Sequence, residues 1–330
     1  YGPVEGIAPL REALLEKLHT DNRIKPSDDT ELIVTAGANM AFLNAIMAIA
    51  DPDDEIILLT PYYFNHEMTV RMLNCRVRVV DTDRLFHPLV NEISNAVNDR
   101  TRAIVTISPN NPTGAVYSEL ELREINELCR QRNIYHISDE AYEYFTWNGH
   151  RHYSVASDPS ASQHTISLFS LSKSFGFAGW RIGYMLIPEQ LSEPVRKVQD
   201  SNLICAATIA QFAALGAIRT GNDYCRSRQD VIASNRKLAL DMVGSLECVQ
   251  DEVHAEGAFY VFLRVDSDMN AFELCRRLIE DHGVAVIPGG PFGVTDQCSI
   301  RISYGALDTG RFELALQRLA KGLSATVIHC

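Results

Sequence analysis

The chain alternates between short apolar runs and longer segments with helical periodicity. Between residues 9 and 20, leucines recur at helical spacing and Pro9 falls in the first turn, which predicts an amphipathic helix. Apolar runs of strand length occur at 31–36, 55–60, 76–80, 102–108, 134–138, 165–169 and 182–187. Helices are predicted between most of these strands, at 40–50, 64–74, 91–98 and 118–132.

The strands are continuous apolar runs, which is typical of strands buried on both faces. We therefore predict an α/β fold with a mostly parallel central sheet flanked by helices. After Pro188 the pattern is helical, at 189–201, 204–219 and 222–246. The last third differs, because half-exposed strands at 258–263 and 298–302 alternate with helices at 270–281 and 310–322. We predict a large domain, 1–230, and a smaller α+β domain, 231–330, joined through the long helix.

Composition and charge exclude several classes of protein. The 330 residues are 46% apolar and 22% charged, an ordinary globular balance, and the net charge of −12 argues against a surface for nucleic acid or anionic membranes. No apolar run reaches the roughly 18 residues of a membrane span, and no signal-peptide pattern is present. The eight cysteines are scattered without a C-x-x-C pair, which favours reduced cytoplasmic thiols over a disulfide framework or a metal site.

One lysine stands out in residues 170–181. Lys173 has serines on both sides, and a glycine-punctuated stretch leads from it to Trp180 and Arg181. Two predicted core strands flank this stretch, so a tight loop would hold the lysine in place. The alternative is an ordinary surface lysine on a hairpin, since most lysines are exposed.

Other polar residues follow predicted strands at their carboxyl ends, where ligands bind in open α/β sheets. A Gly37-Ala38-Asn39 turn before a helix would offer backbone N–H groups to a phosphate, although it could be an ordinary turn. Tyr63 could stack on a ring or belong to the core, and Asn111 lies in a proline-rich turn. Asp139 either caps a helix at 140–146 or holds a cation, since a buried carboxylate needs a partner. Arg301 lies between apolar neighbours and could bind a carboxylate.

Taken together, these residues resemble a known family. The matching motifs are G-x-N at 37–39, P-Y-Y at 61–63, S-P-N-N-P-T-G at 108–114, S-D-E-A-Y at 138–142, S-x-S-K at 170–173 with Arg181, and R-I-S at 301–303. The chain resembles the class I/II aminotransferases of pyridoxal-phosphate fold type I, to which aspartate aminotransferase belongs. The resemblance covers nearly the whole chain, in the expected order and spacing.

The resemblance implies pyridoxal 5'-phosphate as cofactor and gives the residues their roles. Lys173 would form the Schiff base and shuttle the substrate's α-proton, with a pKa lowered by surrounding cations. Asp139 would pair with the pyridinium nitrogen, and Tyr142 and Asn111 would hydrogen-bond the phenolic oxygen. Tyr63 would stack on the ring.

The same resemblance implies a phosphate site and a substrate site. The phosphate would be held by the backbone of Ala38 and Asn39, the Ser170 hydroxyl and the Arg181 guanidinium. Arg301, helped by Asn111, would bind the substrate α-carboxylate. No metal is implied.

Tyr1 resembles the tyrosine that opens the motif Y-x-x-x-x-G-x-x-x-L-R of this family. In the family this residue reaches the phosphate of the neighbouring subunit, so the resemblance implies a homodimer with shared active sites. The N-terminal arm of the family would precede Tyr1 and is absent from this chain. We expect the natural chain to be longer.

The resemblance leaves the reaction and substrate open. We predict an aminotransferase that moves the amino group of an L-amino acid to a 2-oxo acid such as 2-oxoglutarate. One aspartate-using subgroup has a lysine at the position of Asn39, so we favour a neutral or aromatic donor. A carbon–sulfur β-lyase or an aminocyclopropane-carboxylate-synthase-like enzyme could use the same scaffold. A ligand-sensing regulator would need a DNA-binding domain, which these residues do not contain.

Overall fold

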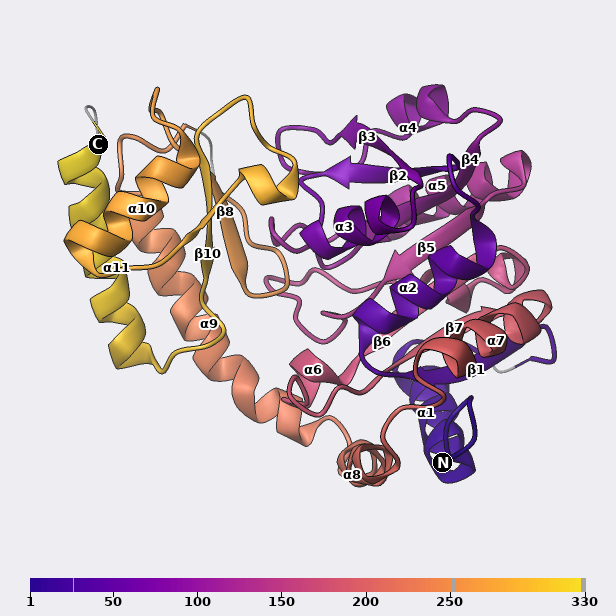
Figure 1. Ribbon diagram of the computed structural model, residues 1–330. Helices are drawn as coiled ribbons and strands as arrows, with labels where there is room; N and C mark the ends of the chain where they lie inside the picture. Colours follow the sequence, from indigo (N-terminus) through magenta and orange to yellow (C-terminus); the bar gives the residue numbers. More distant parts are fainter. Residues whose placement is uncertain (26, 251–252, 328–330) are drawn as a thin grey trace.

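A seven-stranded sheet forms the centre of the larger part of the molecule (Figure 1). The computed structural model describes residues 1–25, 27–250 and 253–327. In spatial order the strands are β1 (Thr30–Thr35), β7 (Gly183–Pro188), β6 (Thr165–Ser170), β5 (Tyr135–Asp139), β4 (Thr101–Ile107), β2 (Glu55–Thr60) and β3 (Arg76–Asp81). Strand β7 is antiparallel to both of its neighbours, and the other pairs are parallel. The prediction of a mostly parallel sheet is confirmed.

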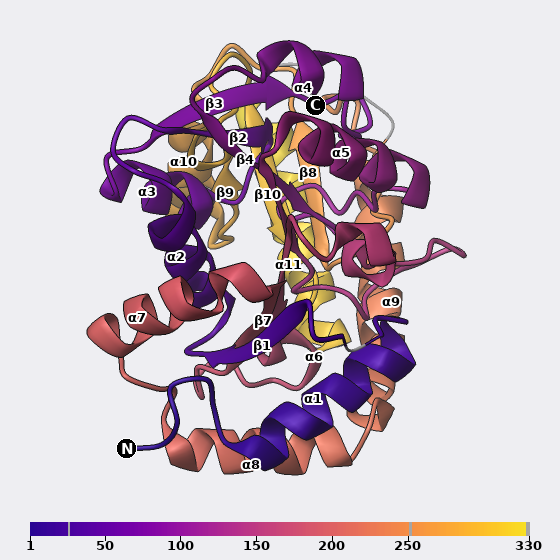
Figure 2. The same cartoon turned by 90° about the vertical axis from the view of Figure 1, so that its right-hand side faces the viewer.

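Helices cover both faces of this sheet (Figure 2). One face packs against α2 (Ala38–Ile49), α3 (Phe64–Met72) and α7 (Ser192–Asn202). The other face packs against α1 (Ala8–Asp21), α4 (Val90–Ala96), α5 (Glu119–Arg132) and α8 (Thr208–Arg219). The central strands are therefore buried along most of their length, whereas the edge strand β3 exposes Arg76, Arg78 and Val79.

A smaller antiparallel sheet lies beside the first one. Its strands are β8 (Tyr260–Arg264), β10 (Ser299–Ser303) and β9 (Ile287–Pro288), in the order β8-β10-β9. It packs against α9 (Asp223–Val243), α10 (Ala271–His282) and α11 (Thr309–Thr326) in a core of its own. The long helix α9 runs from the larger part to this sheet, as Figure 1 shows. The boundary at 230/231 falls inside α9 and stays a prediction.

Several local expectations were wrong. Lys173 lies in a short helix, α6 (Leu171–Ser174), and not in the expected tight loop. No helix follows Asp139, because residues 141–144 form turns, so the helix-cap interpretation fails. Short 3-10 helices occur at Val155–Ser157, Pro159–Ala161, Glu189–Leu191 and Gly290–Phe292.

The cysteines are not all reduced. Cys248 takes part in a disulfide bond, contrary to the sequence expectation, because the spacing of cysteines does not reveal which of them meet in the fold. The described free cysteines are Cys75, Cys129, Cys205, Cys225, Cys275 and Cys298. Cys330 lies outside the described residues.

Candidate active site

The loops that follow five strands of the large sheet meet at one pocket. It is lined by Ala38, Asn39, Tyr63, Ile107, Asn111, Asp139, Ala141, Tyr142, Ser170, Ser172, Lys173, Ala178 and Arg181. These loops follow β1, β2, β4, β5 and β6, whose carboxyl ends lie at the same edge of the sheet. The predicted site residues between Ala38 and Arg181 all lie in this pocket. Tyr1 does not line it and is fully exposed on the single chain.

Lys173 lies half-buried in the pocket, held by the turn of α6. Ser170 caps this helix, because its hydroxyl accepts a hydrogen bond from the Ser172 N–H at 3.1 Å. The Lys173 Nζ lies 5.6 Å from the centre of the Tyr142 ring and 5.9 Å from that of Phe259. Burial lowers the pKa of Lys173, and the positive charge of Arg301 lowers it further, while Asp139 acts in the opposite direction. The amine at this position therefore loses its proton more readily than an ordinary lysine.

Asp139 ends β5 as a buried carboxylate with two partners. Its Oδ2 lies 3.2 Å from the Nε2 of His66, and its Oδ1 accepts the Ala141 N–H at 3.1 Å. His66 is buried on α3 and stacks on Phe42, with ring centres 4.0 Å apart. The sequence analysis missed His66. Its position three residues after Tyr63, at the start of a helix, would have indicated that both side chains face the same way.

The smaller sheet contributes Arg301 to the site through Asn111. The Arg301 Nη1 donates to the Asn111 Oδ1 at 2.8 Å, and the Asn111 Nδ2 donates to the Tyr142 hydroxyl at 3.4 Å. The Arg301 guanidinium lies over the rings of Tyr260 and Phe292, at 4.5 and 5.1 Å from their centres. Its Nε is buried without a hydrogen-bond partner among the described residues, which suits a carboxylate ligand.

Tyr63 is held at its phenol by an asparagine. The Asn65 Nδ2 donates to the Tyr63 hydroxyl at 2.8 Å, and Asn39 lines the same pocket. Burial raises the pKa of Tyr63, so its hydroxyl stays neutral. The ring therefore has a fixed orientation at the edge of the pocket, as stacking on a planar ligand requires.

A cationic cradle forms the opposite end of the pocket. The Arg181 guanidinium donates to the carbonyls of Ala178 at 2.9 Å and Ala36 at 3.2 Å, and it lies against Gly37. Gly37 has φ of 86° and leaves no room for a Cβ beside Arg181. Helix α2 begins at the next residue, so its first N–H groups and Arg181 are available to one anion.

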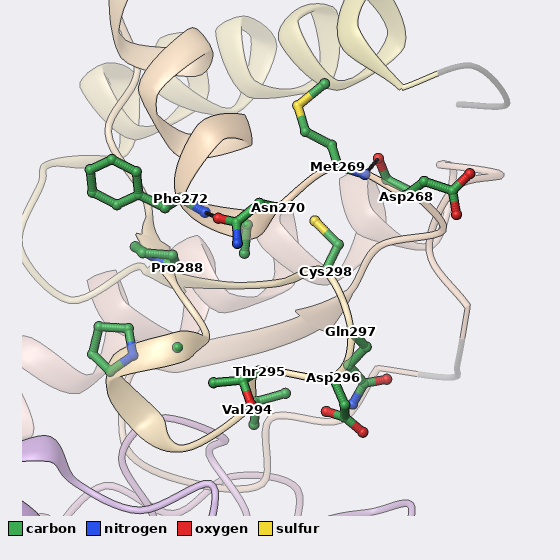
Figure 3. Close-up of a pocket in the computed structure, with 14 residues that line it drawn as sticks. Asp268, Met269, Asn270, Phe272, Pro288, Val294, Thr295, Asp296, Gln297 and Cys298 are labelled. Atoms are coloured by element: carbon green, nitrogen blue, oxygen red, sulfur yellow. Dashed lines mark hydrogen bonds between the residues drawn. The ribbon is translucent and has the colours of Figure 1, made fainter.

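A separate pocket in the smaller part of the molecule holds none of these residues. It has a volume of about 570 Å³ and lies between the start of α10 and the segment 288–298 (Figure 3). Among the described residues that line it, the charged ones are Asp268 and Asp296. This pocket offers no cation to a phosphate or a carboxylate, in contrast to the pocket at Lys173.

Comparison with known proteins identifies the family. The family model described as aminotransferase class I and II matches residues 1–319. The chain belongs to this family. It is 35% identical to a probable aspartate/prephenate aminotransferase of Aquifex aeolicus, over 98% of this chain and 83% of that protein. It is 32% identical to the aromatic aminotransferase ISS1 of Arabidopsis thaliana, over 100% of this chain and 83% of that protein.

The solved structures give the same result for the fold. The aromatic aminotransferase from Pyrococcus horikoshii OT3 superposes on this aminotransferase with a TM-score of 0.92, at 32% identity, covering 98% of this chain and 88% of that one. The predicted family, fold type I and aminotransferase class are confirmed. None of the helices in the described ranges is long and apolar enough to cross a membrane.

The environment of Lys173 predicts a measurable titration. We expect the Lys173 amine to lose its proton at lower pH than an ordinary lysine side chain, because burial and Arg301 disfavour its charged form. The pH dependence of labelling by a small amine-reactive reagent, read by mass spectrometry on the peptide that contains Lys173, measures the midpoint. In Arg301→Leu this midpoint should rise. A wild-type midpoint at or above that of a lysine in a short unstructured peptide would contradict the proposed effect of burial and Arg301.

Proposed function

We propose that this aminotransferase uses pyridoxal 5'-phosphate, with Lys173 as its covalent anchor. The observation that carries the proposal is one pocket that holds a lysine with a lowered pKa and a buried carboxylate, Asp139, and that Arg301 meets through its hydrogen bond with Asn111. When bound, the cofactor supplies an electron sink for the bond that is broken at the substrate Cα.

The residues present fit this cofactor along its whole length. The cradle formed by Arg181, Ala38 and Asn39 suits a phosphate, and the Ser170 hydroxyl lines the same pocket. The buried Asp139 suits a protonated ring nitrogen. The phenol of Tyr142, joined to Asn111, would hydrogen-bond the phenolic oxygen.

Separate residues of the chain would then bind the substrate, orient the cofactor ring and transfer the proton. Arg301 binds the α-carboxylate of the substrate, and Asn111 fixes the guanidinium. Tyr63 limits the tilt of the ring from one side. Lys173, once its amine is free, would take the α-proton of the substrate, because a neutral amine is the form that accepts a proton.

Replacing Lys173 tests the centre of this proposal. In Lys173→Ala, turnover should fall by about 10²-fold or more, since both the covalent anchor and the proton-transfer group are lost. Steady-state amino transfer to 2-oxoglutarate and the absorbance of the bound cofactor measure the effect. The matched control is Lys237→Ala, at an exposed lysine of α9, which should keep both properties. Turnover in Lys173→Ala equal to that of the wild type would refute the assignment.

We propose an aromatic L-amino acid as the preferred donor. Among the described residues that line the pocket, the cations are Lys173 and Arg181, and Arg301 contacts it through Asn111; each already has a role. Asn39 adds no charge for a distal carboxylate. Relatives named as aromatic aminotransferases support this choice, and relatives named for aspartate and prephenate support a dicarboxylic 2-oxo acid as acceptor. These relatives carry transferase names, which disfavours a β-lyase.

A panel of donors tests the substrate. With 2-oxoglutarate as acceptor, kcat/KM for phenylalanine and tyrosine should exceed that for aspartate by roughly tenfold or more, because a buried carboxylate without a partner is costly. Chromatography of the 2-oxo acid products and a separate assay for ammonia distinguish amino transfer from elimination. A preference for aspartate, or release of ammonia in step with turnover, would contradict the proposal.

We also propose a cytoplasmic homodimer with shared active sites; six of the described cysteines are free, which favours a reducing compartment. The phosphate end of the pocket is open on the single chain, where Asn39, Trp180 and Arg181 are exposed. Apolar side chains on α8, Ile209 and Phe212, are exposed as well. A second copy that covers this face would complete the phosphate site, and Tyr1 would contribute from the partner.

The dimer predicts a mass in solution. Sedimentation equilibrium at the protein concentrations of the activity assay should give twice the chain mass of 36.8 kDa. Phe212→Asp should shift the mass toward one chain, because a charge would be buried at the contact. Leu314→Asp, at an exposed leucine of α11, is the control and should remain dimeric. A monomeric wild type with full activity would be inconsistent with shared sites.

A further inference from the structure

Tyr260 touches two functional groups of the site and has no role in the proposed function. It lies on β8 and is buried, with about 5% of its surface exposed. Its hydroxyl lies 2.9 Å from the hydroxyl of Tyr142, and its ring lies beneath the Arg301 guanidinium at 4.5 Å. Tyr260 is therefore in contact with both the phenol that faces the pocket and the arginine that would bind a carboxylate.

The orientation of the Asn111 amide is fixed by Arg301. A guanidinium has donors and no acceptor, so the Asn111 atom that faces it at 2.8 Å must be the oxygen. The amide nitrogen then faces Tyr142 at 3.4 Å and donates to its hydroxyl oxygen. One acceptor position of Tyr142 is thus occupied.

The hydrogen bond between the two tyrosines has two possible directions. A phenol has one proton and two acceptor positions. If Tyr142 donated to Tyr260, its proton would point away from the pocket. If Tyr260 donates, Tyr142 accepts from both Asn111 and Tyr260, and its own proton is left for a ligand.

The charge of Arg301 favours the second direction. The Arg301 guanidinium lies 4.5 Å from the centre of the Tyr260 ring and opposes the rise in the pKa of Tyr260 that burial causes. The Lys173 amine lies farther from Tyr142, at 5.6 Å from its ring centre, and its pKa is lowered. The phenol beneath the permanent cation is therefore the better donor.

We propose that Tyr260 is a positioning residue for both halves of the site. Its hydroxyl donates to Tyr142, so that the Tyr142 proton points into the pocket, and its ring supports Arg301 in the place where a carboxylate binds. The proposal rests on the proposed function, in which Tyr142 hydrogen-bonds the cofactor and Arg301 binds the substrate. It assigns one side chain to two separable tasks.

Two substitutions separate these tasks. Tyr260→Phe keeps the ring and removes the hydroxyl, so KM for the amino acid should stay within about twofold. The affinity for the cofactor should fall roughly 2- to 12-fold, the usual effect of one hydrogen bond, and the pH midpoint of its absorbance should move in the same direction as in Tyr142→Phe. Tyr260→Leu also removes the ring, and KM should rise roughly 2- to 30-fold, as expected for a lost cation–π contact.

A double-mutant cycle tests whether Tyr260 acts on cofactor binding through Tyr142. Equilibrium dialysis of the cofactor against apoprotein gives a dissociation constant that does not depend on turnover. In the Tyr142→Phe background, Tyr260→Phe should leave this constant unchanged, because its hydroxyl then has no partner to orient. The matched control is Tyr304→Phe, at a fully buried tyrosine of the same core whose hydroxyl donates to the Ala258 carbonyl. This control should keep the cofactor affinity and the absorbance midpoint of the wild type.

The outcomes distinguish this proposal from the one on which it rests. If Tyr142→Phe alone leaves cofactor affinity and absorbance unchanged, the proposed role of Tyr142 fails, and with it the role of Tyr260. Suppose instead that Tyr142→Phe weakens cofactor binding as expected. The positioning role of Tyr260 alone is then overturned if Tyr260→Phe weakens cofactor binding equally in the wild type and in Tyr142→Phe. It is also overturned if Tyr260→Phe lowers only the thermal stability of the apoprotein. An unchanged KM in folded Tyr260→Leu would contradict the proposal that the Tyr260 ring supports Arg301.

Discussion

The buried carboxylate of Asp139 is the group on which the rest of the pocket depends. An isolated carboxylate costs several kcal/mol to bury, so it requires partners that are themselves held in place. His66 from α3 and the Ala141 N–H supply hydrogen bonds, and Lys173 from α6 lies close enough for its pKa to respond to the charge. These partners come from separate elements, and the need to satisfy one charge therefore fixes how α3, α6 and the end of β5 lie relative to one another.

The second constraint is the junction between the two sheets. Arg301 on β10 meets Asn111, which follows β4, and the Gly257 N–H donates to the Gly114 carbonyl at 2.7 Å. A Cβ at Gly114 would lie 2.8 Å from the Tyr260 carbonyl oxygen, so this turn and β8 can approach only because this residue is glycine. The turn at 108–114 thus connects the sheets as well as presenting Asn111, which explains its density of proline and glycine.

The sequence predicted most of the fold because buried strands and amphipathic helices have different apolar periods. Strand 55–60 agrees with β2 at both ends, and the helix at 118–132 agrees with α5 to within a residue. Other features leave no such pattern. A buried strand is equally apolar in either direction, so the antiparallel course of β7 could not be predicted, and β9 is only two residues long.

The site was predictable where its residues follow strands and not where they come from elsewhere. A polar side chain that is buried at the end of a strand costs free energy of folding unless it has a partner or a ligand. This contrast makes Asn111, Asp139 and Lys173 stand out in the sequence. His66 and Tyr260 have no such contrast, since a histidine on a helix and a tyrosine in an apolar strand both look like core residues. Their roles arise only from contacts between segments distant in sequence.

The pocket is asymmetric, and this asymmetry suits the proposed cofactor. Asp139 is buried with about 6% of its surface exposed, whereas Asn39 and Arg181 at the other end are exposed on the single chain. A low dielectric strengthens the interaction between a carboxylate and a protonated ring nitrogen. A phosphate carries more charge and is costlier to desolvate, so it is better held near the surface by a cation and a helix N-terminus. On the single chain the pocket thus has a buried end for the reacting ring and an exposed end for the phosphate, which a second copy would cover in the proposed dimer.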